Sequence, residues 1–282
     1  MKIVVFADIH SNLPVFNKAY QDSLTKNIDM YLFLGDYVTD GYEADKIIDI
    51  IKSTNGHAIN GNRDVAIVEY HKEKNPNWDK YMQYWNLKYG YNCLKQDSIE
   101  YLETLPIYKI INIGGKKICM AHNTPYGLRG NVLEDNFEMF DRLVDDFDCD
   151  VYLMGHTHIS YNIEYKDRQF INVGSIGLPT DGLPFKYGIL TISDSIEYEQ
   201  IKVDYDYNEL ENYYKNSEYY KEVTIWCSIL LELLKSGADH PQFLLDYAFA
   251  KCDEKGIDRS EGIPNDLFEE YANEYMTKIK RK

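Results

Sequence analysis

The sequence lacks any long apolar run. No stretch approaches the roughly 20 consecutive apolar residues that a membrane-spanning helix needs. Met1 leads directly into the short apolar run Lys2-Ile3-Val4-Val5-Phe6 and not into the pattern of a secretory signal. We therefore expect a cytoplasmic protein that does not associate with membranes.

Cysteine is scarce and scattered. The chain has five cysteines and no Cys-x-x-Cys pair, which argues against a disulfide framework or a cysteine-bound metal. Cys119 and Cys149 lie in or beside apolar runs, so we expect them to be small, reduced core residues and not metal ligands.

Positive charge is also in short supply. Lysine and arginine together number 30 against 46 acidic residues, so the net charge is −16, and the dense basic run is confined to residues 278–282. Binding of long nucleic acid needs a basic face that releases counterions. The composition argues against such a partner but leaves small phosphorylated substrates open, because metal ions can supply positive charge locally.

Apolar runs alternate with helical patterns up to about residue 204, which predicts an α/β fold. The 282 residues, 44% of them hydrophobic, are sufficient for a large core. Gly114-Gly115 between two apolar runs predicts a hairpin, so part of the sheet should be antiparallel. The expected strands lie near 2–7, 29–34, 57–60, 107–112, 117–121, 150–154, 169–173, 187–193 and 197–203. The expected helices lie near 14–27, 42–53, 66–104 with breaks at Asn75-Pro76 and Gly90, and 134–147.

The character of the sequence changes after Asp206. A tyrosine-rich polar stretch is followed by helical patterns near 219–235, 241–255 and 263–279. Pro241 and Pro264 are suitable helix starts, and Gly237 and Gly256 are suitable stops. We predict a first domain over 1–204 and a helical C-terminal extension over 205–282. The extension is expected to pack on the first domain, to mediate a dimer or bind a protein partner, or to cover a cleft as a lid.

Candidate metal ligands follow the predicted strands, and the carboxyl ends of parallel strands meet at one edge of a sheet. The motifs are Asp8-Ile9-His10, Gly35-Asp36, Gly61-Asn62-Arg63-Asp64, His122 and Gly155-His156-Thr157-His158. Taken singly, most of these are ordinary turns or helix caps, and His57, His71 and His240 are expected to be surface or capping residues. Together, in this order after successive strands, they predict a site for two metal ions.

Mixed oxygen and imidazole donors suit Mn, Fe, Zn, Co or Ni better than Ca. Two divalent ions, two aspartates and one hydroxide leave a net charge of about +1, which attracts a phosphate. Bound metal also lowers the pKa of water toward ~7. The donor set therefore predicts metal-assisted hydrolysis of a phosphoester.

The ordered motifs resemble those of the calcineurin-like metallophosphoesterases. The segment 172–177, Asn-Val-Gly-Ser-Ile-Gly, followed by Asp181-Gly182, is similar to a loop of their small bacterial and archaeal phosphodiesterase branch. The resemblance covers about residues 1–204. It implies a four-layer αββα sandwich, with two mixed β-sheets inside and helices outside.

The resemblance also implies roles for single residues. One metal would be held by Asp8, His10 and His158, the other by Asn62, His122 and His156, and Asp36 would bridge the two. Hydroxide between the metals would attack phosphorus in line with the leaving oxygen. Manganese is the ion we expect, with Fe, Zn, Ni and Co as alternatives. The segment 172–177 would shape the site and not bind metal.

Arg63 stands where many family members have a histidine that assists the leaving group. A guanidinium stays protonated and cannot donate a proton, but it can hold two phosphate oxygens and stabilise negative charge. We expect Arg63, oriented by Asp64, to do this and to favour good leaving groups. The other interpretation is a surface ion pair between Arg63 and Asp64.

The expected function is a phosphodiesterase with Asp36, Asn62, Arg63, Asp64 and His122 in its catalytic site, of which Asn62 and Arg63 contact the substrate. The alternatives are a phosphomonoesterase or protein phosphatase of the same fold, a nuclease, which the net charge disfavours, and a non-catalytic scaffold such as the retromer subunit that shares this fold. The complete set of ligand positions argues against a scaffold.

Overall fold

The structure, a computed structural model, describes residues 1–280; residues 281 and 282, the end of the basic run, lie outside it. The strands are β1 (Lys2–Phe6), β2 (Met30–Phe33), β3 (Gly56–Ala58), β4 (Tyr108–Ile113), β5 (Lys116–Ala121), β6 (Val151–Met154), β7 (Tyr161–Tyr165), β8 (Arg168–Asn172), β9 (Phe185–Ile192) and β10 (Ile196–Val203). The α-helices are α1 (Leu13–Leu24), α2 (Ala44–Ser53), α3 (Asn62–Lys72), α4 (Asn77–Lys80), α5 (Trp85–Asn92), α6 (Gln96–Thr104), α7 (Phe137–Phe147), α8 (Tyr207–Lys215), α9 (Glu218–Glu222), α10 (Thr224–Ser236), α11 (His240–Lys255) and α12 (Asn265–Ile279).

The strands form two five-stranded mixed sheets, in the orders β10-β9-β1-β2-β3 and β4-β5-β6-β8-β7. In the first sheet β1, β2 and β3 are parallel, and β9 and β10 run antiparallel at one side. In the second sheet β5, β6 and β8 are parallel, with the antiparallel β4 and β7 at its two edges. The predicted hairpin at Gly114-Gly115 is confirmed.

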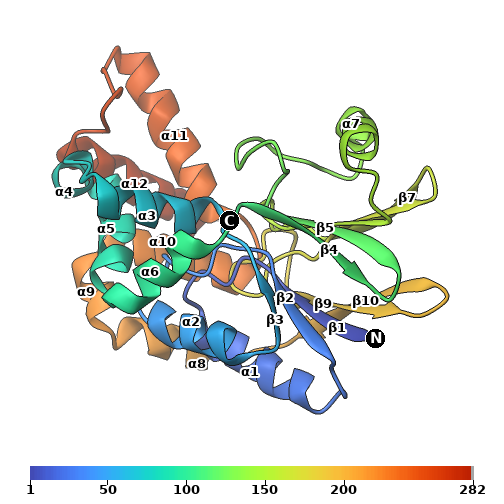
Figure 1. The fold of residues 1–282 in the computed structure, drawn as a ribbon. Coiled ribbons are helices and arrows are strands. Elements are labelled where there is room, and N and C mark those ends of the chain that lie inside the picture. Colours follow the sequence, from blue (N-terminus) through green and yellow to red (C-terminus); the bar gives the residue numbers. More distant parts are fainter. Residues whose placement is uncertain (281–282) are drawn as a thin grey trace.

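The two sheets pack face to face, and helices cover their outer faces (Figure 1). The alternation along β1 shows the layers: Ile3 and Val5 join the core between the sheets, whereas Val4 and Phe6 join the core under the helices. Phe140 of α7 belongs to a separate cluster on the outer face of the second sheet. The predicted four-layer αββα fold is confirmed.

The helical extension packs beside α3–α6 (Figure 1). Leu210, Tyr214 and Leu230 belong to the same apolar cluster as Val4 and Phe6 of β1. The helices α10–α12 also have a cluster of their own, to which Leu244 and Phe268 belong. The extension therefore shares a core with the first sheet, while the division of the chain at residue 204 stays a prediction.

Some elements differ from the predictions. β7 and α8 were not expected, although Tyr161, Ile163 and Tyr165 alternate with polar residues and Tyr207, Leu210 and Tyr214 recur at helical spacing. The expected helix near 219–235 is divided into α9 and α10 at Val223. Gly237 and Gly256 end α10 and α11 in the left-handed conformation, as predicted. No helix in residues 1–280 is long and apolar enough to cross a membrane.

Candidate metal centre

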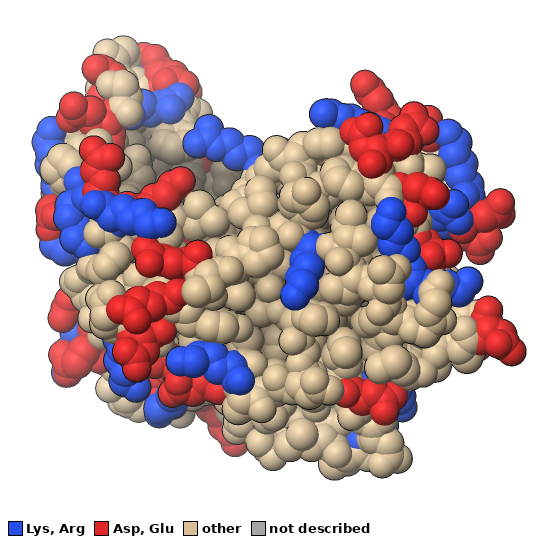
Figure 2. All heavy atoms as spheres, viewed as in Figure 1, with Lys and Arg blue, Asp and Glu red and all other residues tan. Residues whose placement is uncertain are grey.

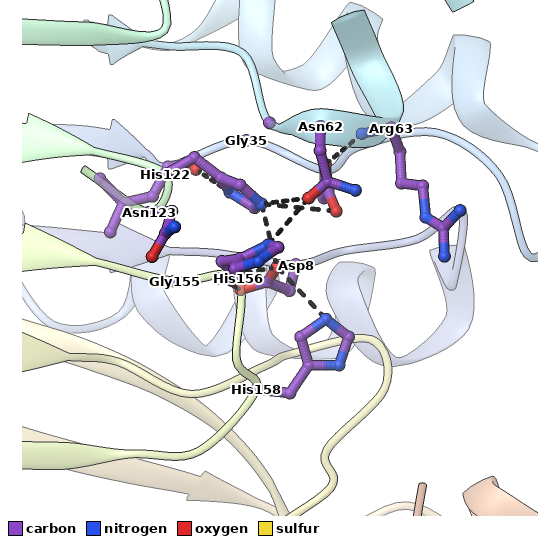
Figure 3. A network of polar contacts seen from close by, with 12 residues as sticks. Asp8, Gly35, Asn62, Arg63, His122, Asn123, Gly155, His156 and His158 are labelled. Carbon is purple, nitrogen blue, oxygen red and sulfur yellow. Dashed lines mark hydrogen bonds and ion pairs between the residues drawn. The ribbon is translucent and has the colours of Figure 1, made fainter. Parts of the chain in front are cut away.

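The seven predicted ligands converge at the carboxyl ends of the parallel strands (Figure 3). They come from four connections and the start of one helix: Asp8 and His10 follow β1, Asp36 follows β2, Asn62 begins α3, His122 follows β5, and His156 and His158 follow β6. The ligand atoms of Asp8, His10 and His158 all lie within 4.8 Å of one another, and so do those of Asp8, Asp36 and His122.

The first group is centred on two imidazoles that face each other. Nε2 of His10 lies 3.2 Å from Nε2 of His158, which lies 3.3 Å from Oδ1 of Asp8. The Nδ1 atoms of both rings have other partners, Asp40 Oδ2 at 3.0 Å and the carbonyl oxygen of Leu178 at 2.5 Å. Each ring therefore donates its Nδ1 proton outward and presents Nε2 to the centre.

The second group of contacts surrounds the Asn62 side chain and consists of Asn62, His122 and His156. Asn62 Oδ1 lies 3.1 Å from His122 Nε2 and 2.9 Å from His156 Nδ1. His122 donates its Nδ1 proton to the carbonyl oxygen of Leu34, at 2.7 Å. Asp36 lies between the two groups, because its Oδ2 is 3.6 Å from His10 Nε2 and 3.5 Å from His122 Nε2.

Acceptor atoms thus face acceptor atoms around three of the four imidazoles. With their Nδ1 protons donated outward, His10, His122 and His158 present lone pairs to one another, to carboxylates and to an amide oxygen. Such a cluster is favourable only around cations, whether protons or metal ions. The donors are the oxygen and imidazole types that suit transition-metal ions, so these residues fit a metal centre.

The pKa values reflect the same need for positive charge. Burial would raise the pKa of Asp36, but His122 and His10 lower it more, and the pKa lies well below its usual range. Burial would lower the pKa of His122, but the Asp36 and Asp8 carboxylates raise it to about 9. Protons on the imidazoles and metal ions therefore compete for the same carboxylates.

The backbone at the centre is strained. Five of the seven residues have a positive φ, which is uncommon outside glycine: Asp8 at 54°, His10 at 47°, Asp36 at 55°, His156 at 68° and His158 at 58°. Each such residue costs about 1–3 kcal/mol, and strain of this kind gathers at functional sites. A Cβ on Gly61 would lie 2.1 Å from Asp36 Oδ1, so glycine is required there for close approach.

Asp40 is a further member of the site that the sequence analysis missed. It is 3% exposed, and its Oδ2 faces His10 Nδ1 at 3.0 Å. The indole Nε1 of Trp226 donates to Asp40 Oδ1 at 2.8 Å, and Asn86 Nδ2 donates to the same oxygen at 2.8 Å. Burial would raise the pKa of Asp40, but His10 lowers it well below the usual range. The helical extension therefore holds a carboxylate that orients a candidate ligand.

The segment 172–177 braces the loops that carry ligands. Asn172 Nδ2 donates to the carbonyl oxygen of Gly155 at 2.6 Å, and Ser175 Oγ donates to that of Asp8 at 2.8 Å. A Cβ on Gly177 would lie 2.0 Å from the Ile9 carbonyl oxygen. These contacts agree with the expectation that the segment shapes the site.

The predicted role of Asp64 is wrong, and so is the surface ion pair. Asp64 is fully buried, and its carboxylate accepts hydrogen bonds from the backbone N–H groups of Asp36, Tyr37 and Gly61, at 2.7–3.0 Å. No ion pair joins Asp64 to the Arg63 guanidinium in residues 1–280. Both oxygens of the Asp64 side chain accept hydrogen bonds from backbone N–H groups, so Asp64 positions the Asp36 loop and does not orient the Arg63 guanidinium.

Arg63 instead presents its guanidinium to open space beside the centre (Figure 3). Its backbone N–H donates to Asp36 Oδ1 at 2.7 Å, and its Nε has no hydrogen-bond partner among residues 1–280. The remaining histidines lie apart from the centre. His57 lies beside Lys109, His71 beside Tyr91 and His240 beside Tyr275.

Residues 1–195 match the family model described as a calcineurin-like phosphoesterase superfamily domain. An uncharacterized protein of Methanocaldococcus jannaschii is 28% identical over 228 residues, 72% of this chain and 88% of its own. A metallophosphoesterase from Sphaerobacter thermophilus has a similar structure, with a TM-score of 0.67, 20% identity, and coverage of 84% of this chain and 99% of that one. A hypothetical protein from Pyrococcus horikoshii gives a TM-score of 0.65 at 22% identity, covering 84% and 98%. At these identities the two structures support the fold alone.

Proposed function

The chain belongs to the calcineurin-like phosphoesterase superfamily, and we propose that it is a metal-dependent phosphodiesterase in which hydroxide attacks phosphorus in line with the leaving oxygen. The observation that carries the proposal is the cluster of acceptor atoms that face one another at the strand ends. Asp8, His10 and His158 would hold one divalent ion, Asn62, His122 and His156 the other, and Asp36 both. Bound there, two ions would supply positive charge and make hydroxide available near neutral pH.

The protein's own groups determine the orientation of the substrate and the charge that it meets. The unpaired guanidinium of Arg63 can bind two oxygens of the phosphate with parallel hydrogen bonds. It cannot protonate a leaving oxygen, which favours esters whose leaving group has a low pKa. The backbone N–H groups that hold Asp64 fix the Asp36 loop, so that Asp36 needs no rearrangement during the reaction.

The charges favour a diester over a monoester. Asp8, Asp36 and Asp40 carry three negative charges, whereas burial and the nearby Asp36 raise the pKa of Asp64 to about 7, so that Asp64 adds only part of a charge. Two divalent ions would then leave about one positive charge, and Arg63 would add a second. A monoanionic diester and one hydroxide balance these two charges. A dianionic monoester would leave negative charge in excess in a buried site, which is unfavourable.

The experiment compares bis(p-nitrophenyl) phosphate with p-nitrophenyl phosphate on metal-stripped protein titrated with manganese. We expect metal-dependent turnover with the diester preferred. Asp36→Asn should abolish turnover, whereas Asp194→Asn, which alters an exposed carboxylate in a turn, is the matched control. Faster turnover of the monoester would contradict the diester preference. Absence of turnover with Mn, Fe, Zn, Ni and Co would refute the hydrolase and favour a scaffold.

A further inference from the structure

A cleft of about 540 Å³ extends from the candidate metal centre to the helical extension. Its polar end consists of metal-site residues and Arg63. The apolar side chains of its lining, which are called the apolar end, are Leu133, Ile159, Leu178, Trp226, Leu233, Pro241, Phe243 and Leu245, and the uncharged polar residues Asn131, Thr157, Thr180 and Gln242 line the cleft too. Figure 2 shows the surface hollowed between α11 and the segment that leads into α7. The metal end needs only a phosphate, so the apolar end is free to contact another part of a substrate.

The apolar end brings together side chains that are otherwise costly to expose. Leu133 is 37% exposed, Ile159 39% and Phe243 49%, and they come from the segment before α7, the loop after β6 and helix α11. A single exposed apolar residue is ordinary. Three from separate segments around one cleft indicate a binding surface.

The charges in the cleft restrict what this surface can bind. Apart from metal-site residues, the charged groups lining the cleft are Arg63 and Asp239, which begins α11. Asp239 and His158 line the same cleft. A second anionic group on the substrate would therefore meet a carboxylate instead of a cation. The group bound at the apolar end should be uncharged.

We propose that the apolar end binds an uncharged aromatic ring on the ester oxygen that is not cleaved, so that the substrates are phosphodiesters whose retained ester group is aromatic. The proposal rests on the proposed function and names its substrate class. Aromatic rings give a large apolar contact and can pack against Phe243 and Trp226. Polyphosphates, which bring further negative charge, fit this cleft poorly.

The test uses two diesters with one leaving group, methyl p-nitrophenyl phosphate and phenyl p-nitrophenyl phosphate, and the full-length manganese-loaded protein. The ratio of their kcat/KM values, corrected by their spontaneous hydrolysis rates, isolates the ring. We expect the phenyl ester to be preferred at least about tenfold, because differences of one or a few methylenes in apolar pockets reach this size. Phe243→Ala and Ile159→Ser should each lower the ratio about threefold or more.

Phe137→Ala is the matched control, because Phe137 on α7 is 46% exposed and lies outside the cleft. It should leave the ratio unchanged. Hydrolysis of both diesters with a ratio near one, or a ratio that Phe243→Ala does not alter, would overturn the aromatic proposal and leave the hydrolase intact.

A binding experiment separates the two proposals if neither diester is hydrolysed. Phenylphosphonate and methylphosphonate, which have no ester bond, are titrated into the manganese-loaded protein by calorimetry. Tighter binding of phenylphosphonate that Phe243→Ala abolishes would support the ring site even if the hydrolase proposal fails. Equal affinities for the two phosphonates, or a preference that persists in Phe243→Ala, would refute the ring site.

Discussion

Replacing Trp226 with phenylalanine should weaken metal binding without removing any group that contacts metal. Trp226 Nε1 donates to Asp40 Oδ1 at 2.8 Å, and Asp40 Oδ2 faces His10 Nδ1 at 3.0 Å. Phenylalanine keeps much of the apolar contact but removes this donor. Thr39 and Asn86 still bind Asp40, so its carboxylate stays buried but is held less firmly.

Two independent magnitudes agree for this change. A hydrogen bond to a charged group contributes about 1.5–3 kcal/mol. Loss of a group that orients a metal ligand typically lowers metal affinity by about 10–100-fold, which corresponds to about 1.4–2.8 kcal/mol. We therefore expect Trp226→Phe to bind manganese about 10–100-fold more weakly at the site that includes His10.

The measurement is competition for manganese between the folded, metal-stripped protein and a fluorescent chelator at fixed pH. Trp85→Phe is the matched control, because Trp85 Nε1 donates only to the exposed Asp79 carbonyl oxygen, at 3.3 Å. Asp40→Asn should weaken binding at least as much, because it removes the carboxylate itself. Wild-type affinity in a well-folded Trp226→Phe protein would show that the indole supports packing and does not orient His10.

Three further changes test other parts of the structure. Arg63→Ala should lower kcat/KM by about 10–100-fold through loss of charged hydrogen bonds, and the loss should be smaller for aryl esters than for alkyl esters. Arg63→Lys should not restore the paired contact. Equal losses of kcat/KM for both ester types in steady-state assays would indicate that Arg63 only supports the loop. Gly61→Ala should displace Asp36, because the added Cβ would lie 2.1 Å from Asp36 Oδ1. Calorimetric titration should then show much weaker metal binding than in Gly115→Ala. At Gly115 the φ angle is also positive, at +80°, but the added Cβ meets nothing within 4 Å. Removal of residues 205–282 should leave the first domain unfolded or insoluble. Each fully buried side chain such as Leu210 or Leu230 contributes about 1.5–3 kcal/mol, whereas the free energy of unfolding of a whole domain is only about 5–15 kcal/mol. A soluble truncated protein with a native circular dichroism spectrum would contradict this prediction.

The fold could be predicted from local pattern because burial repeats along each strand. The continuous apolar run Ile3-Val4-Val5-Phe6 is visible in the sequence, and in the structure its alternate side chains enter the two cores. β7 was missed although Tyr161, Ile163 and Tyr165 alternate with polar residues, because five residues at a sheet edge give only a short pattern.

The candidate site could be located from the sequence for a similar reason. Each ligand motif directly follows an apolar strand, and parallel strands bring their carboxyl ends to one edge. The structure brings the seven residues together there, while their roles as ligands stay a prediction. Asp40 left one trace in the sequence, as a second acid four residues after Asp36 in the same loop, but such acids are common.

By itself, the pattern of the sequence determined the α/β architecture and the edge at which the chemical groups gather, because these depend on periodicity and on the order of strands. The division into two mixed sheets was implied only by the resemblance of the ordered motifs to the calcineurin-like family. Only the tertiary structure decided which groups support that edge. Trp226 reaches Asp40 across 186 positions of sequence. Asp64 accepts hydrogen bonds from the backbone of the Asp36 loop instead of pairing with its neighbour Arg63. Such contacts depend on where separate segments meet in space, which no local spacing encodes.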